Sequence, residues 1–343
     1  MTASRIAPTF AALSVALAAC ADAPTAATSS KLTPGAADAV VKPCKVGCST
    51  RIAYSRMYFG PASTVYPDSG HIFTMLTDGT SKQQLTSGPG YNQDPSWSPG
   101  YTKIAFSSMR RGTNNHSKIF VMNADGSGVT QLTPNDIHDD QIPRWSPDGK
   151  QLVFSSDRGP GGTEQLWVVN VDGTGLTQLT SDSFVYRTPQ WAPNGSAIYF
   201  STNRLNGKWD IGMIALRGSL AGVKMLTNTP TEDEIDIALS PDGTRIAAAS
   251  IVTTSNIRQI NEYDAATGAK VAGVLQYPGF DKMPRNLTYA PNGATIAFTE
   301  YQYHAATGQT TAVVMRRPLG GWGQVSTPLT PAGEYNFAGG WVR

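Results

Sequence analysis

The stretch "PRWSPDGKQLVFSSDRG", residues 143–159, contains the repeat that decides the fold. An aromatic residue leads into Ser-Pro-Asp-Gly, and a short apolar run follows before a second polar break. Pro presets the backbone at the second position of a type I turn, Asp can bond its own backbone, and Gly ends the turn. The run "LVF" favours a strand and is too short for a helix. The stretch therefore predicts a strand, a tight turn and a second strand.

The same pattern returns through the chain at nearly constant intervals. Its anchoring positions are Trp97, Trp145, Trp191, Leu239, Tyr289 and Trp341. The intervals between them are 48, 46, 48, 50 and 52 residues. The period that opens at Trp145 also contains the hairpin sequence "VVNVDGTG", in which Asp-Gly stands between two β-prone runs, whereas "NEYDAATGAKVAGVL" replaces this form in the fifth unit. Such periods indicate a repeat architecture, and we expect each anchoring Trp to pack between neighbouring repeats.

Four antiparallel strands in about 45 residues are typical of a propeller blade. The second strand of each unit can be counted separately as "RIAYSR", "KIAFSS", "QLVFSS", "AIYFST", "RIAAAS" and "TIAFTE". The first of these has no Trp-Ser-Pro segment before it, and Trp341 has no strands after it. The sequence therefore predicts an all-β fold, a six-bladed β-propeller of four-stranded antiparallel blades over residues 51–343. We expect the C-terminal strand to close it by joining the N-terminal three strands, which removes a free sheet edge.

The first twenty residues, "MTASRIAPTFAALSVALAAC", have one Arg and then an apolar stretch too short to span a bilayer. Small residues precede Cys20, and Leu-Ala-Ala-Cys resembles the lipobox of bacterial lipoproteins, in which the Cys is lipidated. The alternative is an ordinary signal peptide with an incidental Cys. We predict a lipoprotein signal peptide over residues 1–19, a membrane anchor at Cys20 and a flexible Ala/Thr/Ser/Pro-rich tether over 20–43. The expected location is the periplasmic side of the outer membrane or the cell surface.

Two further cysteines, Cys44 and Cys48, begin a short loop over residues 44–50 that leads into the propeller. A local disulfide is the interpretation that an exported protein favours. A zinc site would need two more ligands at suitable spacing, and no His or Cys stands nearby. We predict no metal at these cysteines.

The sequence "PRWSPDGKQLVFSSDRG…QLWVVNVDGTGLTQLT" resembles the PD40, or WD40-like, repeat of TolB-type propellers. The resemblance covers residues 51–343 and is weakest in the fifth unit, where Leu239 replaces the Trp. It implies binding of an envelope protein at the axial mouth, and "YNQDPSW", with Gln93 and Asp94, is similar to segments that this family directs toward that opening. TolB carries an α/β domain ahead of its propeller, whereas the tether expected here is too short for one, and a lipid anchor is a second difference.

The sequence offers little that is typical of an enzyme. A G-x-S-x-G elbow, an H-E-x-x-H pair, a P-loop and a dinucleotide-binding glycine pattern are all missing. We therefore predict no cofactor and no catalytic residue. The formal net charge is +2 and the basic residues form no stripe, so nucleic acid is not an expected partner.

Candidate binding residues come from the loops that lead into the innermost strands, because these loops converge on the axial mouth of a propeller. The loops read "GYNQDP", "IHDDQIP", "FVYRTP", "TEDEID", "GFDKMPR" and "EYNFAG". The residues singled out are Gln93, Asp94, His138, Asp139, Asp140, Tyr186, Arg187, Glu234, Asp281, Arg285 and Asn336.

Several interpretations of these residues compete. They are ordinary solvated loop charges, or they form a recognition surface, as the accompanying Tyr91 and Tyr186 suggest. Alternatively, His138 with Asp139, Asp140 and Glu234 binds a divalent metal for polysaccharide lyase or hydrolase chemistry. A small-ligand sensor is a further alternative. The sequence favours a non-catalytic protein-binding scaffold of the bacterial cell envelope.

Overall fold

The computed structural model describes residues 51–58, 69–110, 115–205, 207–216, 222–279, 281–304, 309–320, 324–332 and 334–341. The chain divides into two units, residues 1–41 and 42–343, and every described residue belongs to the second. The predicted signal peptide, lipidation site Cys20, tether and Cys44–Cys48 disulfide all lie outside the described residues. Within these residues, no helix has the length and apolar character needed to cross a membrane.

The described residues form strands β1 to β24 and one short 3-10 turn at Pro160–Gly162. Three of the sheets contain four antiparallel strands each. The first consists of β8 (Asp140–Trp145), β9 (Gln151–Ser156), β10 (Gln165–Asn170) and β11 (Thr177–Gln178). The second consists of β12 (Tyr186–Trp191), β13 (Ala197–Leu205), β14 (Lys208–Ala215) and β15 (Lys224–Met225). The third consists of β16 (Glu232–Leu239), β17 (Arg245–Val252), β18 (Ile257–Asp264) and β19 (Lys270–Tyr277).

The fourth sheet contains twelve strands. One group in it is β20 (Lys282–Tyr289), β21 (Thr295–His304), β22 (Gln309–Pro318) and β23 (Thr327–Pro328). Another is β24 (Tyr335–Trp341), β1 (Arg51–Tyr58), β2 (Ser69–Leu76) and β3 (Gln83–Gln84). The last is β4 (Gly90–Trp97), β5 (Lys103–Arg110), β6 (Lys118–Asn123) and β7 (Thr130–Gln131). Pairing is antiparallel within each group, and single parallel pairs, Ala312 with Tyr335 and Gly70 with Tyr91, join one group to the next.

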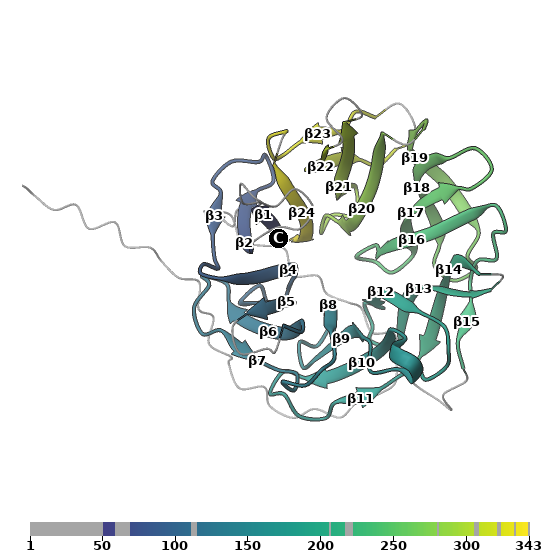
Figure 1. Ribbon diagram of the computed structural model, residues 1–343. Helices are drawn as coiled ribbons and strands as arrows, with labels where there is room; N and C mark the ends of the chain where they lie inside the picture. Colours follow the sequence, from purple (N-terminus) through teal and green to yellow (C-terminus); the bar gives the residue numbers. More distant parts are fainter. Residues whose placement is uncertain are drawn as a thin grey trace, which may run out of the picture. The chain divides into compact units, whose positions relative to one another are not determined.

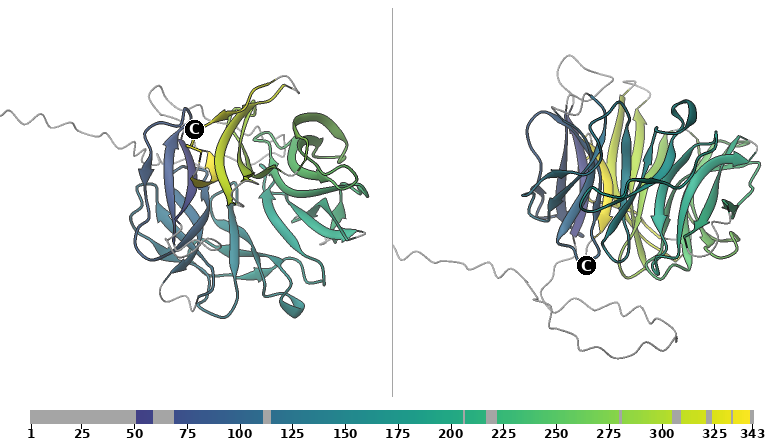
Figure 2. Two further views of the ribbon diagram at one scale, coloured as in Figure 1. Left: turned by 45° about the horizontal axis from the view of Figure 1, so that its top comes forward. Right: turned by 90° about the horizontal axis from the view of Figure 1, so that it is seen from below.

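The sheets stand around a common axis, with β4, β8, β12, β16, β20 and β24 innermost (Figure 1). These six are called the inner strands below, and the other views show the remaining strands of each sheet stacked outward from them (Figure 2). The predicted all-β propeller of four-stranded antiparallel blades is confirmed. The strands are grouped into four hydrogen-bonded sheets and not the expected six, because the parallel pairs merge three groups into one. The C-terminal β24 pairs antiparallel with β1, with Tyr54 opposite Ala338.

The Ser-Pro-Asp-Gly sequence forms the predicted turn. The hydroxyl of Ser146 donates to Asp148 Oδ1 at 2.6 Å, and the same carboxylate oxygen accepts the backbone N–H of Lys150 at 3.0 Å. Gly149 has a φ of 70°, which a residue without Cβ adopts at little cost. Local side-chain hydrogen bonds therefore fix the link between β8 and β9.

The anchoring Trp residues join neighbouring inner strands. The indole Nε1 of Trp145 donates to the carbonyl oxygen of Ser96 at 3.0 Å, and that of Trp191 donates to the carbonyl oxygen of Arg144 at 3.2 Å. Trp145 also packs in a buried cluster with Ala105 and Phe154, which come from two adjacent groups of strands. The hydrophobic core therefore lies between adjacent sheets, as the repeat predicts.

Four inner strands carry the same β-bulge, in which two residues oppose one buried Phe of the next strand. The first residue of the bulge has a positive φ in each case: Asp94 (54°), Ile142 (57°), Thr188 (49°) and Asn286 (52°). The opposing residues are Phe106, Phe154, Phe200 and Phe298, all with no exposed surface. Positive φ is uncommon for any non-glycine residue and unfavourable for β-branched Ile and Thr. The bulges therefore hold strained backbone next to the axis.

Candidate functional site

A pocket of about 670 Å³ lies at the end of the axis where the inner strands begin. This end is called the mouth below, and the cavity the mouth pocket. Its lining residues come from β8, β12, β16 and β20 and from strands just outside them. They are Gln141, Ile142, Glu164, Arg187, Thr188, Trp209, Ile235, Asp236, Met283, Arg285, Asn286 and Tyr301. Its volume is in the range of small-ligand sites, about 300–1,000 Å³.

A second cavity, of about 290 Å³, lies at the opposite end of the axis. Its walls are the last residues of the inner strands, including the indoles of Trp97, Trp145, Trp191 and Trp341. Arg144 also lines this cavity, whereas Asp236 and Arg285 line the mouth pocket. The two ends of the axis therefore differ in chemistry, because the aromatic anchors gather at one end and most of the charged side chains at the other.

Four charged side chains surround the axis: Asp94, Arg144, Asp236 and Arg285. Each interacts electrostatically with at least one of the others, yet no direct ion pair joins any two of them in the described part of the chain. Burial raises the pKa of Asp94 and raises that of Asp236 to about 6, against the opposing effects of Arg144 and Arg285 respectively. Burial also lowers the pKa values of Arg144 and Arg285. Attraction at these separations therefore only partly offsets the cost of burying the charges.

Arg187 stands at the outer wall of the mouth pocket. Its guanidinium makes two hydrogen bonds to Glu164, of 2.5 and 2.6 Å, and lies over the ring of Trp209 at 5.5 Å from the centroid. The bond to Glu164 raises the pKa of Arg187. Arg187 bonds Glu164 through two nitrogens and also stacks on Trp209. These three side chains therefore form a flat, partly exposed wall at the mouth, called the Arg187–Trp209 wall.

A network around Asp136 fixes the loop before β8. Arg158 Nη1 donates to the buried Asp140, and its Nη2 donates to Asp136 Oδ2 at 2.8 Å. Lys118, which has no exposed surface, donates to Asp136 Oδ1 at 2.7 Å. His138 Nδ1 lies 3.1 Å from Asp157 Oδ1, a residue in the loop after β9. These polar groups have protein partners, which assigns them a structural role.

The predicted candidate residues do not form one ring at the mouth. Arg187 and Arg285 line the mouth pocket, Asp94 lies near it on the axis, and Gln93 pairs with Ser107 in the ladder beside it. His138 and Asp139 belong to the loop before β8, where Asp139 accepts the backbone N–H of Ser117, and Asp140 is the first residue of β8. The remaining residues lie elsewhere: Tyr186 and Asn336 are fully buried, Glu234 is buried within its sheet, and Asp281 is exposed ahead of β20.

Glu234 differs most clearly from the expected position at the axial mouth. Its carboxylate accepts hydrogen bonds from Tyr263 at 3.0 Å and from Thr229 at 2.8 and 2.9 Å. Burial raises its pKa to about 7, and the neighbouring carboxylate of Asp210 acts in the same direction. Its side chain therefore lies within its own sheet, bonded to Tyr263 of β18 and to Thr229 just before β16.

The four residues considered for a metal site are also separated. Glu234 bonds within the sheet of β16, whereas Asp140 bonds Arg158 in the sheet of β8. Among the described residues, no group of three or more His, Cys, Asp or Glu side chains is arranged to hold a metal ion. The metal-assisted lyase or hydrolase stays an alternative that no contact described here favours.

Several residues of the mouth pocket were not predicted. Asp236 and Tyr301 lie within strands, Trp209 lies near the start of β14, and Glu164 directly precedes β10. Arg144, which lines the cavity at the opposite end, was not predicted either. A charged residue inside an otherwise apolar strand sequence, as in "EIDIAL" for Asp236, is the pattern that could have indicated them, because a buried charge is rare without a specific environment.

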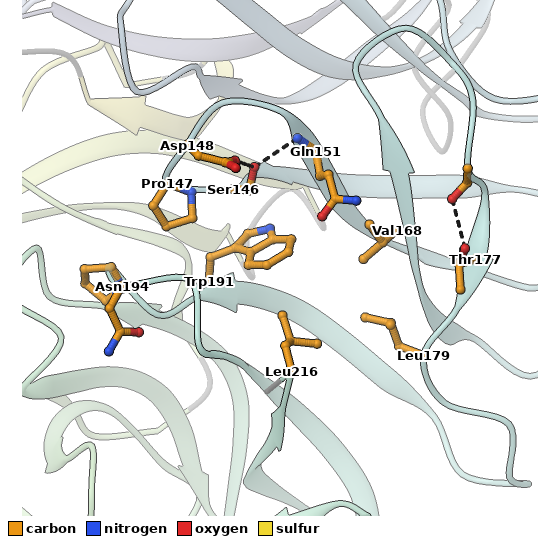
Figure 3. A pocket seen from close by; sticks show the side chains of 13 residues that line it. Ser146, Pro147, Asp148, Gln151, Val168, Thr177, Leu179, Trp191, Asn194 and Leu216 are labelled. Carbon is orange, nitrogen blue, oxygen red and sulfur yellow. Dashed lines mark hydrogen bonds between the residues drawn. The ribbon is translucent and has the colours of Figure 1, made fainter. Parts of the chain in front are cut away.

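A lateral pocket of about 620 Å³ lies between the sheets of β8 and β12. Figure 3 shows the indole of Trp191 between the Ser146–Asp148 turn and Leu216, with Val168 and Leu179 opposite. Its polar groups bond within the protein, for example Ser146 with Asp148, and Thr177 with the carbonyl oxygen of Gly175 at 2.9 Å. These contacts distinguish the lateral pocket from the mouth pocket, where several polar groups have no such partner.

The fold and its mouth place the protein in the class of β-propellers whose inner strands surround a polar axis. The chain belongs to the TolB beta propeller domain family, PD40, whose sequence model matches residues 69–274. No curated protein sequence matches the chain.

Solved structures with a similar fold have low sequence identity. TolB from Acinetobacter baumannii is 21% identical with a TM-score of 0.65, over 85% of this chain and 66% of that one. A putative TolB from Agrobacterium tumefaciens is 15% identical with a TM-score of 0.60, over 85% of this chain and 91% of that one. An oligogalacturonate lyase from Vibrio parahaemolyticus is 14% identical with a TM-score of 0.54, over 82% of this chain and 80% of that one. These likenesses show a shared fold, and the chain spans just under two thirds of the Acinetobacter protein.

Proposed function

We propose that this chain is a non-catalytic protein-binding scaffold of the bacterial cell envelope, with an envelope protein or peptide as the partner that docks on the mouth. The observation that carries the proposal is a set of exposed apolar side chains at that end of the axis. Ile137 is 73% exposed, Tyr303 48% and Met109 39%. Exposed apolar side chains beside polar and aromatic groups are typical of protein-binding surfaces.

All three side chains belong to the mouth end. Ile137 precedes the start of β8, Tyr303 lies beside the start of β20, and Met109 pairs with Tyr91 at the start of β4. They therefore lie at the same end of the axis as the mouth pocket, on three different groups of strands. A partner that covers this surface would bury both the apolar side chains and the rim of the pocket.

A six-bladed, closed ring is the second part of the proposal. The twelve-stranded sheet contains three inner strands, β4, β20 and β24, and single parallel pairs join its three groups. Counting each group as a blade gives six with the three separate sheets. Antiparallel pairing of β24 with β1 supports closure by the C-terminal strand. A closed ring would hold the inner strands in fixed positions and give a partner a rigid surface.

The location is the third part of the proposal. The Leu-Ala-Ala-Cys sequence supports a lipid anchor at Cys20, and the similarity to TolB proteins supports an envelope role. We place the propeller on the periplasmic side of the outer membrane or at the cell surface, with a Cys44–Cys48 disulfide in the sequence that leads into it. Mass spectrometry of the membrane fraction, with detection of a lipid-modified Cys20, tests the anchor.

Cross-linking in the native envelope followed by mass spectrometry tests the binding role. Wild-type protein is compared with an Ile137→Asp/Tyr303→Asp double variant and with Val325→Asp. Val325 is 78% exposed and lies ahead of the outermost strand β23, so it is a matched apolar control away from the mouth. We expect a partner whose yield falls at least about tenfold in the double variant, since loss of apolar anchors costs more than about 1.4 kcal/mol. The Val325 variant should retain it.

A partner captured equally by all three proteins would overturn the proposed docking surface. Cross-links confined to the opposite end of the axis, where Trp97 and Trp341 lie, would do the same. Circular dichroism of each variant confirms that its fold is intact before the yields are compared.

A further inference from the structure

The mouth pocket contains a guanidinium that lacks a close partner. Arg285 lies on β20 and lines the pocket, and within the described residues no hydrogen bond or ion pair involves its side chain. Asp236 and Tyr301 act on it only electrostatically. A guanidinium has five N–H donors, and because none of these bonds a described protein acceptor, they are available to a group that enters the pocket. The geometry therefore predicts an acceptor group inside the pocket.

The pocket also contains acceptor oxygens that can take further hydrogen bonds. Asp236 is 7% exposed, and one of its carboxylate oxygens accepts the backbone N–H of Asn286. Thr188 is 8% exposed, and its hydroxyl oxygen has no hydrogen-bond partner. The side-chain oxygen of Asn286 is buried and has none either. A buried polar group without a hydrogen-bond partner is unfavourable. These three residues therefore favour a hydrogen-bond donor in the pocket, and a cationic donor fits the carboxylate best.

The acceptor groups are held in place by the bulges. Thr188 and Asn286 both have positive φ, 49° and 52°, and both follow an arginine that lines the pocket. Each bulge thus sets an arginine and an acceptor side by side on consecutive residues. Trp209, Met283 and Ile142 supply apolar surface between the polar groups.

We propose that the mouth pocket binds a zwitterionic ligand, a free amino acid or a peptide of two or three residues with both ends free. Its ammonium group is bound by Asp236, the Thr188 hydroxyl and the Asn286 side-chain oxygen. Its carboxylate is bound by Arg285, and its side chains contact the apolar wall. A simple anion would be repelled by Asp236 and a simple cation by Arg285, whereas a ligand that carries both charges can pair with each of these two residues.

This inference goes beyond docking on the mouth, because it concerns the pocket between the inner strands and needs no second protein. Isothermal titration calorimetry of the purified full chain tests it independently of the cross-linking. The probes are L-leucine, Ala-Leu and Ala-Leu-Ala, each compared with its N-acetylated and its C-amidated form. The free forms distinguish an amino-acid site from a peptide site.

We expect at least one free-ended probe to bind, and acetylation or amidation to weaken its binding about 10- to 100-fold, the loss of one charge-assisted hydrogen-bonding group. Asp236→Asn should weaken the free form and abolish its advantage over the acetylated form. Arg285→Gln should abolish the advantage over the amidated form. Lys150→Gln and Asp125→Asn, exposed residues outside the pocket, serve as charge-matched controls and should bind like the wild type.

The proposal is overturned if none of the free-ended probes binds at millimolar concentration, or if blocking either end leaves affinity unchanged. It is also overturned if Asp236→Asn and Arg285→Gln weaken all forms of a probe equally, because that pattern indicates a structural role. Where either variant fails to fold, the comparison of free and blocked probes on the wild-type protein decides alone.

Discussion

Trp145 and Ser96 connect two neighbouring groups of strands through a hydrogen bond of 3.0 Å from the indole Nε1 to the carbonyl oxygen. The two residues are 49 positions apart, close to one repeat. Trp191 makes the same contact to Arg144 one repeat later. Trp145 and Trp191 therefore do more than fill space between sheets, because the polar edge of each indole fixes the position of one inner strand against the next.

The first prediction concerns this bond. We expect Trp145→Phe to lower the free energy of unfolding by about 1–3 kcal/mol, since the Ser96 carbonyl loses a buried donor. Trp341→Phe is a matched control: both Trp residues are 8% exposed, and the Nε1 of Trp341 has no hydrogen-bond partner. Trp341→Phe should therefore lower the free energy of unfolding by less than Trp145→Phe does. Urea denaturation measures both, and equal losses would show that the bond adds nothing to stability.

The second prediction concerns packing of β24. A Cβ on Gly339 would lie 2.5 Å from Pro95 Cγ, 2.6 Å from the Pro95 oxygen and 2.7 Å from the Ala53 oxygen. Two of these are backbone atoms of other strands, so Gly339→Ala should lower the melting temperature by about 3–10 °C. Gly100→Ala, with nothing within 4 Å of its Cβ, should leave it nearly unchanged. A Gly339→Ala protein as stable as the wild type would contradict the close packing of β24 on β1 and β4.

The third prediction is a pH dependence from Glu234. Its pKa is about 7 in the folded protein and 4.5 in a model peptide, because burial disfavours the charge. As pH rises from 4.5 to 7 the unfolded chain releases a proton that the folded chain keeps, so stability falls by up to about 3 kcal/mol. Glu234→Gln lacks this decrease. Melting temperatures at pH 5 and pH 8 should therefore show the variant gaining on the wild type at the higher pH.

The groups around Glu234 define the control for that experiment. Tyr263, Thr227 and Thr229 contact its carboxylate, and the carboxylates of Asp210 and Glu232 act on it electrostatically. Asp172→Asn alters an exposed carboxylate whose pKa is lowered by hydrogen bonds from Thr174, so its effect lies below pH 5. It should not change the difference between pH 5 and pH 8. If the melting temperatures of the wild type and of Glu234→Gln change equally between pH 5 and pH 8, Glu234 is not the source of the pH dependence.

The fourth prediction compares a buried with an exposed ion pair. Arg158→Met leaves Asp140, which has no exposed surface, without its cationic partner, and should cost about 3–5 kcal/mol. Arg204 bonds Asp182 at 2.8 Å, but the two side chains are 35% and 33% exposed. Arg204→Met should cost less than about 1 kcal/mol. Chemical denaturation of both variants checks the order, and similar costs would show that the Asp136 network is not integral to the fold.

Most of the fold could be predicted because the deciding chemistry is local. The Asp148 turn forms within five residues, and the spacing of the Trp anchors is visible by counting. The grouping of strands into sheets could not be predicted, since it depends on single parallel pairs such as Gly70 with Tyr91 between segments of unrelated sequence.

The site was harder to predict than the fold. Arg187 and Arg285 were among the candidates, but Asp236 and Tyr301 were not. Strand alternation assigns side chains to faces only while the register is regular, and a bulge shifts every following residue to the other face. Because the inner strands carry bulges at Ile142 and at its counterparts, sequence alone does not show which side chains face the axis.

The positive-φ residues of the inner strands have a consequence for how such a protein can change. At each of these positions the backbone geometry is imposed by the surrounding strands and by the Phe opposite, while the side chain is as different as Asp94, Ile142 and Thr188. Substitution there alters the side chains near the axis of the propeller without disturbing the hydrogen-bonded ladders. New selectivity could thus be introduced at a few sites, leaving the rest of the molecule as an unchanged frame.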